Sequence, residues 1–140
     1  MPGADRIAQV TSEWVAKAES DFKSAVHLLK LGVACPTDVV AFHAQQTVEK
    51  YIKAFLTHKQ IDFPKTHDIS KLLALARSPD LATMDIAEQR RLTSYAALAR
   101  YPGWGEIPLS QARQAVALAR RVRREVRRLL PRKALRRRKQ

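Results

Sequence analysis

A set of polar residues with chemical potential runs through the stretch FHAQQTVEKYIKAFL, residues 42–56. Four of them recur every three or four positions and therefore share one side of a helix: His43, Gln46, Lys50 and Lys53. Lysines can hold a phosphate group, and a histidine can orient it or exchange a proton with it. Glu49 precedes Lys53 by four residues, which is the favourable order for an ion pair within a helix. Periodicity alone favours a solvated face.

Further candidates lie in the segments PKTHDI and ARYPG. His67 stands beside Asp68, a plausible helix cap, so it either bonds locally or meets a phosphate near the exposed amides of that helix start, together with Lys65. Arg100 and Tyr101 come just before the helix-breaking pair PG, where a cation is favourable in itself. A structural role and a ligand-binding role are both open for these residues.

The positive charge of the chain is concentrated near its end. The whole chain has a net charge of +13. From residue 110 onward, thirteen Lys and Arg face a single acid, which gives a local net charge of +12. This density exceeds what solubility requires and fits salt-sensitive, sequence-independent phosphate binding. The same charge could dock on an acidic protein patch or on anionic lipid. The expected nucleic-acid contacts are Arg120, Arg124, Arg127, Arg128, Arg136, Arg137 and Arg138.

The elements that must position these residues are all predicted to be helices. Glycine and proline are scarce and clustered, and no segment has the alternation of a strand. Apolar residues at helical spacing predict helices over about residues 6–31 and 37–59, a short one after the cap Asp68, one from about Asp85, and a last one after the cap Ser110. Short connections favour antiparallel neighbours. The predicted fold is therefore all-α, an up-and-down antiparallel bundle of four long helices plus one short helix.

Length and composition predict a soluble, cytoplasmic, single-domain protein. We expect residues 1–131 to form the domain and residues 132–140 to be a basic disordered tail, because RKALRRRKQ has too few apolar residues to offset the entropy of ordering. No apolar run approaches the roughly 18 residues of a membrane span, and no signal peptide is evident. Cys35 is the only cysteine, which fits a reducing cytosol. Four scattered histidines have no metal-ligand spacing, so neither a metal nor a cofactor is predicted.

Four motifs in order resemble the HEPN domain family. They are W-x3-AE-x-D from Trp14, FHAQQ-x-VEK-x-IKA-x-L from Phe42, P-x-THDI-x-x-LL from Pro64, and ARYPGW from Ala99. The resemblance covers about residues 12–130. It implies an all-α bundle, frequent homodimerisation, and genetic pairing with a small nucleotidyltransferase in bacterial and archaeal toxin–antitoxin or defence systems. Many members of the family are metal-independent ribonucleases.

The chain departs from the ribonuclease branch of that family. The catalytic signature of the branch is an arginine followed, after four to six residues, by a histidine at the end of the penultimate long helix. Counted from Arg100, these positions hold Gly105, Glu106 and Ile107. The missing histidine removes a principal proton-transfer group. We therefore predict no catalytic residues and interpret the chain as close to the non-nucleolytic branch.

The resulting hypothesis is a protein that binds a nucleotide or RNA phosphate and acts with a separate small nucleotidyltransferase, as a homodimer and without a membrane partner. The predicted site combines Lys50, Lys53, His67, Arg100 and Tyr101. Lysine and arginine would hold phosphate, His67 would orient it or exchange a proton, and Tyr101 would stack or donate a hydrogen bond. Two alternatives stay open: a nonspecific nucleic-acid-binding module that uses the basic terminal helix and tail, and a metal-independent ribonuclease with an atypical site.

Overall fold

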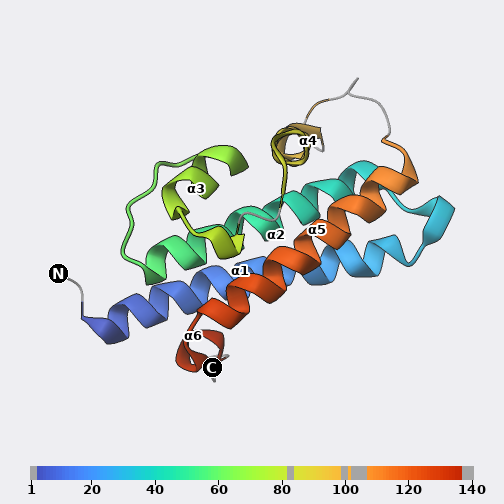
Figure 1. Ribbon diagram of the computed structural model, residues 1–140. Helices are drawn as coiled ribbons and strands as arrows, with labels where there is room; N and C mark the ends of the chain where they lie inside the picture. The colour runs from blue at the N-terminus through green and yellow to red at the C-terminus, as the bar shows by residue number, and fades with distance from the viewer. Residues whose placement is uncertain (1–2, 82–83, 99–100, 102–106, 137–140) are drawn as a thin grey trace.

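The computed structural model describes residues 3–81, 84–98, 101 and 107–136 (Figure 1). These residues form helices and connections, with no strand among them. The helices are α1 (Ala4–Leu29), α2 (Thr37–His58), α3 (Ile69–Ala76), α4 (Ile86–Leu98), α5 (Leu109–Leu129) and α6 (Arg132–Leu135). The predicted all-α class is confirmed, with five major helices and one short additional helix. None of the described helices is both long and apolar enough to cross a membrane.

Local sequence explains several helix starts. The Asp68 carboxylate accepts hydrogen bonds from two backbone amides in the first turn of α3, so this predicted cap is confirmed. Asp85 and Glu88 each accept from the backbone N–H of the other, which is the predicted capping box at the start of α4. The predicted cap Ser110 is wrong. Helix α5 begins directly after Pro108, whose missing N–H is not needed at a helix start.

Helix α2 is the central element of the bundle. It contacts α1, α3, α4 and α5 (Figure 1). Its apolar side is fully buried at Val40, Ala44, Val48, Tyr51, Ile52 and Leu56. Removing a large apolar side chain such as Ile52 from water stabilises the fold by about 1.5–3 kcal/mol. Because α2 is covered on so many sides, its polar residues are drawn into the interior together with its apolar ones.

The C-terminal segment differs from the expected disordered tail over its first residues. Arg132–Leu135 forms α6, which packs against α1 (Figure 1). Ala134 is buried and Leu135 packs against the core. The Ser12 hydroxyl donates to the backbone carbonyl of Arg136 over 3.3 Å. Ala134 and Leu135 stabilise this turn by packing against the core and α1. The composition of the segment alone does not reveal such packing. Residues 137–140, including Arg137 and Arg138, lie outside the described residues, and the domain boundary stays a prediction.

Candidate functional site

The polar side of α2 is buried at Glu49 and Lys53 and half-buried at His43 and Lys50, in contrast to the solvated face that periodicity favours. Glu49 is 3% exposed and Lys53 is 7% exposed. Helix α1 and the connection between α2 and α3 cover them: the Lys53 ammonium lies 5.5 Å from the ring centre of Trp14 and 5.8 Å from that of Phe63. Helical spacing shows that residues share a face, but it does not show what packs against that face.

Glu49 is the centre of a buried hydrogen-bond network, the Glu49 cluster, whose members are Gln45, Gln46, Glu49, Lys53 and His67. The Lys53 ammonium donates to the carboxylate over 2.9 Å, so the ion pair expected from their spacing is confirmed. His67 Nδ1 lies 2.8 Å from the other carboxylate oxygen. Burial alone would raise the pKa of the Glu49 carboxyl, but hydrogen bonds from Lys53, His67 and Gln45 outweigh it and hold this pKa below its usual value. The ionised carboxylate therefore neutralises Lys53.

Asp21 of α1 binds two further residues on the polar side of α2. One carboxylate oxygen lies 2.9 Å from His43 Nδ1, and the second accepts a hydrogen bond from the Lys50 ammonium over 2.6 Å. The Asp21 side chain is only 12% exposed. Lys50, like Lys53, thus has a counterion within the protein.

Glu19 of α1 neutralises the inward side of α5. The Arg123 guanidinium binds the Glu19 carboxylate with two nitrogens, at 2.6 and 3.3 Å, and Arg127 Nη1 lies 3.5 Å from it. The buried Tyr51 hydroxyl donates to the same carboxylate. Burial, and then the bond to Glu19, raise the pKa of Tyr51 and keep the hydroxyl protonated. Burial would also raise the pKa of Glu19, but the bonds from Arg123 and Tyr51 lower it.

The five predicted site residues occupy different environments. Lys50 and Lys53 are each paired with an acid, as described above. Among the members of this set that the structure describes, only Lys53 and His67 are brought together, through Glu49. The His67 side chain is 52% exposed, and Tyr101 is 59% exposed. No hydrogen bond or ion pair joins Tyr101 to another of these residues within the described part of the chain. Arg100 lies outside the described residues.

The outer side of α5 has a different character from its inward side. Exposed arginines recur there at helical spacing and form what we call the α5 arginine stripe: Arg113, Arg120, Arg124 and Arg128. Arg120 also lies over the ring of Phe22, at 5.6 Å. Within the described ranges, no acid is paired with Arg113, Arg124 or Arg128. Exposed bases continue into α6 at Arg132 and Lys133, and beyond it at Arg136.

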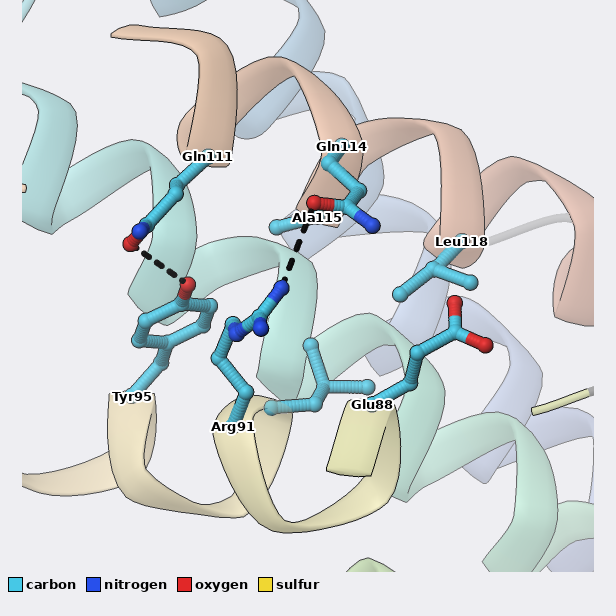
Figure 2. Close-up of a pocket in the computed structure, with 8 residues that line it drawn as sticks. Glu88, Arg91, Tyr95, Gln111, Gln114, Ala115 and Leu118 are labelled. Carbon is cyan, nitrogen blue, oxygen red and sulfur yellow. Dashed lines mark hydrogen bonds between the residues drawn. The ribbon is translucent and has the colours of Figure 1, made fainter. Parts of the chain in front are cut away.

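Among the described residues, two of the hollows that border α5 differ greatly in size. Between α4 and α5, Tyr95 donates to Gln111 and Arg91 donates to Gln114 (Figure 2). The cavity left there is about 10 Å³, which suits one water molecule at most. The second hollow, bordered by α1, the end of α5 and α6, has a volume of about 860 Å³. We call it the C-terminal hollow, and it has the size of a small-molecule site.

Comparison with known proteins shows which family the chain belongs to. The model of the HEPN domain family matches residues 11–129, which is most of the chain. This chain belongs to the HEPN domain family. No curated protein and no solved structure matches it. As a HEPN domain, it is a helical module related to nucleotides or RNA.

The acids that organise this HEPN domain were not among the predicted site residues. Glu19 and Asp21 come from the first motif of the resemblance, and they pair with residues of the second motif and of α5. The available signal was position: Asp21 directly precedes Phe22 and follows Ala18 by three residues, so it lies beside the apolar stripe that had to pack. No three potential metal ligands gather among the described residues, and the absence of a metal stays a prediction.

Proposed function

We propose that this HEPN domain binds RNA through its phosphate groups, using the α5 arginine stripe. The observation that carries the proposal is the contrast within α5. Arg123 and Arg127 face Glu19, whereas Arg124 and Arg128 are exposed and have no acid partner among the described residues. A guanidinium presents donors in a fixed fork that matches phosphate geometry. Its hydrogen-bonding capacity is available where no acid occupies it.

The length of the stripe supports contact with several phosphates at once. Arg113 and Arg128 are fifteen residues apart on one helix, which corresponds to roughly 22 Å at the helical rise per residue. Contacts of this kind release counterions and read no base sequence. The expected binding is therefore nonspecific in sequence and strongly weakened by salt.

A matched pair of triple variants tests this proposal. In the first, Arg120, Arg124 and Arg128 are replaced by Gln; in the second, the exposed Lys17, Lys30 and Lys71 are replaced by Gln, which removes the same charge elsewhere. The affinity for a labelled single-stranded RNA is measured by fluorescence anisotropy across a salt series. The stripe variant should lower the slope of log affinity against log salt by about 2, at about 0.7 per lost phosphate contact. Equal losses in both variants would show that only total charge matters and would reject the stripe as the site.

We also propose that the domain acts with a separate small nucleotidyltransferase in a toxin–antitoxin or defence-type system, as a homodimer. The four motifs and the missing histidine after Arg100 support this proposal. The domain is mixed with the nucleotidyltransferase encoded beside it and analysed by size-exclusion chromatography with light scattering. A joint peak is expected; separate elution of the two proteins would contradict the partnership, and a monomeric mass would contradict the homodimer.

The missing histidine further supports binding without cleavage. RNA from the binding reactions is therefore also run on a gel, and intact RNA is the expected result. Metal-independent shortening of the RNA that is abolished by Arg100→Ala would instead favour the alternative of a ribonuclease with an atypical site.

A second candidate function is nucleotide binding around His67, with Lys50, Lys53, Arg100 and Tyr101 as the other proposed contacts. In this function Lys50 and Lys53 would exchange their acid partners Asp21 and Glu49 for a phosphate group. The observation that favours it is the half-exposed imidazole held by the buried Glu49. When His67 is neutral, the bond at Nδ1 places its proton there and leaves Nε2 as an acceptor. Replacing His67 by Ala should lower nucleotide affinity in isothermal titration. Unchanged affinity with a lower melting temperature would reject the ligand role.

A further inference from the structure

The C-terminal hollow gathers three cations from three separate segments of the chain. Lys23 comes from α1, Arg127 from the end of α5, and Arg136 follows α6. Within the described ranges, no acid pairs with Lys23 or Arg136. Arg127 engages the protein only weakly, because its Nη1 lies 3.5 Å from Glu19 and 3.4 Å from the Tyr51 hydroxyl. Donors of all three residues can therefore turn to a ligand.

The remaining lining is mixed rather than purely basic. Glu13 and Glu19 add two carboxylates, so the lining carries one excess positive charge. The Glu19 carboxylate already accepts hydrogen bonds from Arg123 and Tyr51. The other lining residues supply an amide, two hydroxyls and small apolar surfaces: Gln9, Ser12, Ser20, Val15, Ala16, Ala134 and Leu135. A volume of about 860 Å³ with this lining suits a polar anionic group with an attached organic part.

The position of the hollow identifies which anionic group fits. Arg128, the last member of the α5 arginine stripe, directly precedes the end of α5, and its neighbour Arg127 lines the hollow. An RNA strand that lies along the stripe would therefore place one of the strand's two ends at the hollow. Residues of α6 line the third side of the hollow. Helix α6 lies next to this end of α5 (Figure 1).

We propose that the C-terminal hollow binds the terminal phosphate of an RNA strand that lies along the α5 arginine stripe. A phosphomonoester at a strand end carries a charge of about −1.5 to −2 at pH 7 and three strong acceptor oxygens. Lys23, Arg127 and Arg136 line the hollow from separate segments, so a phosphate group inside it would meet cations from more than one element. The Glu13 carboxylate and nearby hydroxyls can bond the ribose of the last nucleotide. This inference rests on the proposed RNA binding.

Three oligonucleotides of one sequence test the inference on the full chain: one with a 5′-phosphate, one with a 3′-phosphate, and one with hydroxyls at both ends. One of the two phosphorylated strands should bind about tenfold more tightly than the hydroxyl-ended strand, the effect of one charge-assisted hydrogen bond. Equal affinity for all three would overturn this inference and leave the proposed function standing. If none binds, the proposed function fails as well.

Two variants and a control locate the effect. Lys23→Ala should remove the preference for the phosphorylated strand, whereas Lys17→Ala removes the same charge from α1 outside the hollow and should retain it. Ala16→Trp should also remove the preference by filling the hollow without a change in charge, while affinity for the hydroxyl-ended strand stays within twofold. Melting temperatures confirm that each variant is folded. A preference that survives both Lys23→Ala and Ala16→Trp would overturn the assignment.

Competition with AMP distinguishes a strand end from a free nucleotide. AMP presents the same phosphomonoester without the stretch of strand that the α5 arginine stripe would hold. The phosphorylated strand should bind at least tenfold more tightly than AMP, because the stripe contributes further phosphate contacts. If AMP binds as tightly as the phosphorylated strand, the ligand of the hollow is a free nucleotide and the assignment to a strand end is overturned.

Discussion

The polar side of α2 and the outer side of α5 carry the same kind of sequence pattern but have opposite environments. On α2, Lys50 and Lys53 each bind an acid, at 2.6 and 2.9 Å, and Lys53 is almost completely buried. On α5, Arg124 and Arg128 are exposed, and no acid pairs with them among the described residues. The charges of Lys50 and Lys53 are neutralised by acids of the protein itself, whereas Arg124 and Arg128 are exposed to a binding partner.

This difference shows that charge on a helix face has to be judged together with the counterions around it. A buried ion pair stabilises a fold only weakly as a pair, since burying both charges costs desolvation energy, but removing one member leaves an uncompensated charge in the interior. An exposed arginine costs little to keep and little to remove. Substitutions on the polar side of α2 should therefore lower the free energy of unfolding, and substitutions on the outer side of α5 should leave it nearly unchanged.

The largest expected effect is on the Glu49 cluster. Glu49→Ala leaves the ammonium of Lys53, with a side chain only 8% exposed, without its counterion. We expect the free energy of unfolding to fall by about 3–5 kcal/mol in urea titrations. Asp5→Ala, which removes an exposed carboxylate 3.8 Å from Lys133, is the control and should change it by less than about 0.5 kcal/mol. Equal effects of the two variants would remove the distinction between buried and exposed charge.

A smaller loss is expected at Asp21, whose surroundings are partly exposed. Asp21→Ala deprives Lys50 and His43 of their shared acceptor, but their side chains are 22% and 25% exposed and can recover hydration. The expected loss in the free energy of unfolding is about 1.5–3 kcal/mol, measured in the same way. Asp21→Asn keeps the shape and serves as the milder comparison. A loss as large as that of Glu49→Ala would mean that both networks are equally dependent on burial.

The smallest expected effect is the pH dependence of stability that the networks on α2 cause. Stability changes with pH only in the acid range, and at neutral pH this dependence is absent. The pKa values of Glu49 and Glu19 are lower in the folded protein than in the unfolded chain. Their stabilisation is fully present above the unfolded value of about 4.3 and is lost as pH falls through the folded pKa values. Urea unfolding at a series of pH values from 7 to 3 should show this loss. Glu49→Gln should make the acid-side slope shallower, and an unchanged slope would contradict the assigned role.

Much of the fold could be predicted from the sequence because helix signals are local. The caps Asp68 and Asp85, and the apolar spacing of α2, act within one or two turns. The start of α5 was misplaced at Ser110, since Pro108 can precede a helix without a side-chain cap. The turn of α6 was missed because it depends on α1, which is more than a hundred residues away in the chain.

The candidate site was harder to predict for the same physical reason. The spacing of Glu49 and Lys53 predicted their ion pair correctly, since both residues lie on one helix. The contact of His67 with Glu49 and that of Asp21 with Lys50 join separate elements. Periodicity within one helix carries no information about such contacts. The exposed stripe on α5 could be found from charge alone, although the position of Arg127 beside Glu19 could not.

The most direct test measures RNA affinity and the free energy of unfolding for one variant of each face. Arg124→Gln should weaken RNA binding about three- to fivefold, the size of one lost exposed phosphate contact, while the free energy of unfolding changes by less than about 0.5 kcal/mol. Glu49→Gln should lower the free energy of unfolding by more than about 1.5 kcal/mol and leave RNA affinity within twofold. If Glu49→Gln weakens RNA binding and Arg124→Gln does not, the division of roles between α2 and α5 is contradicted.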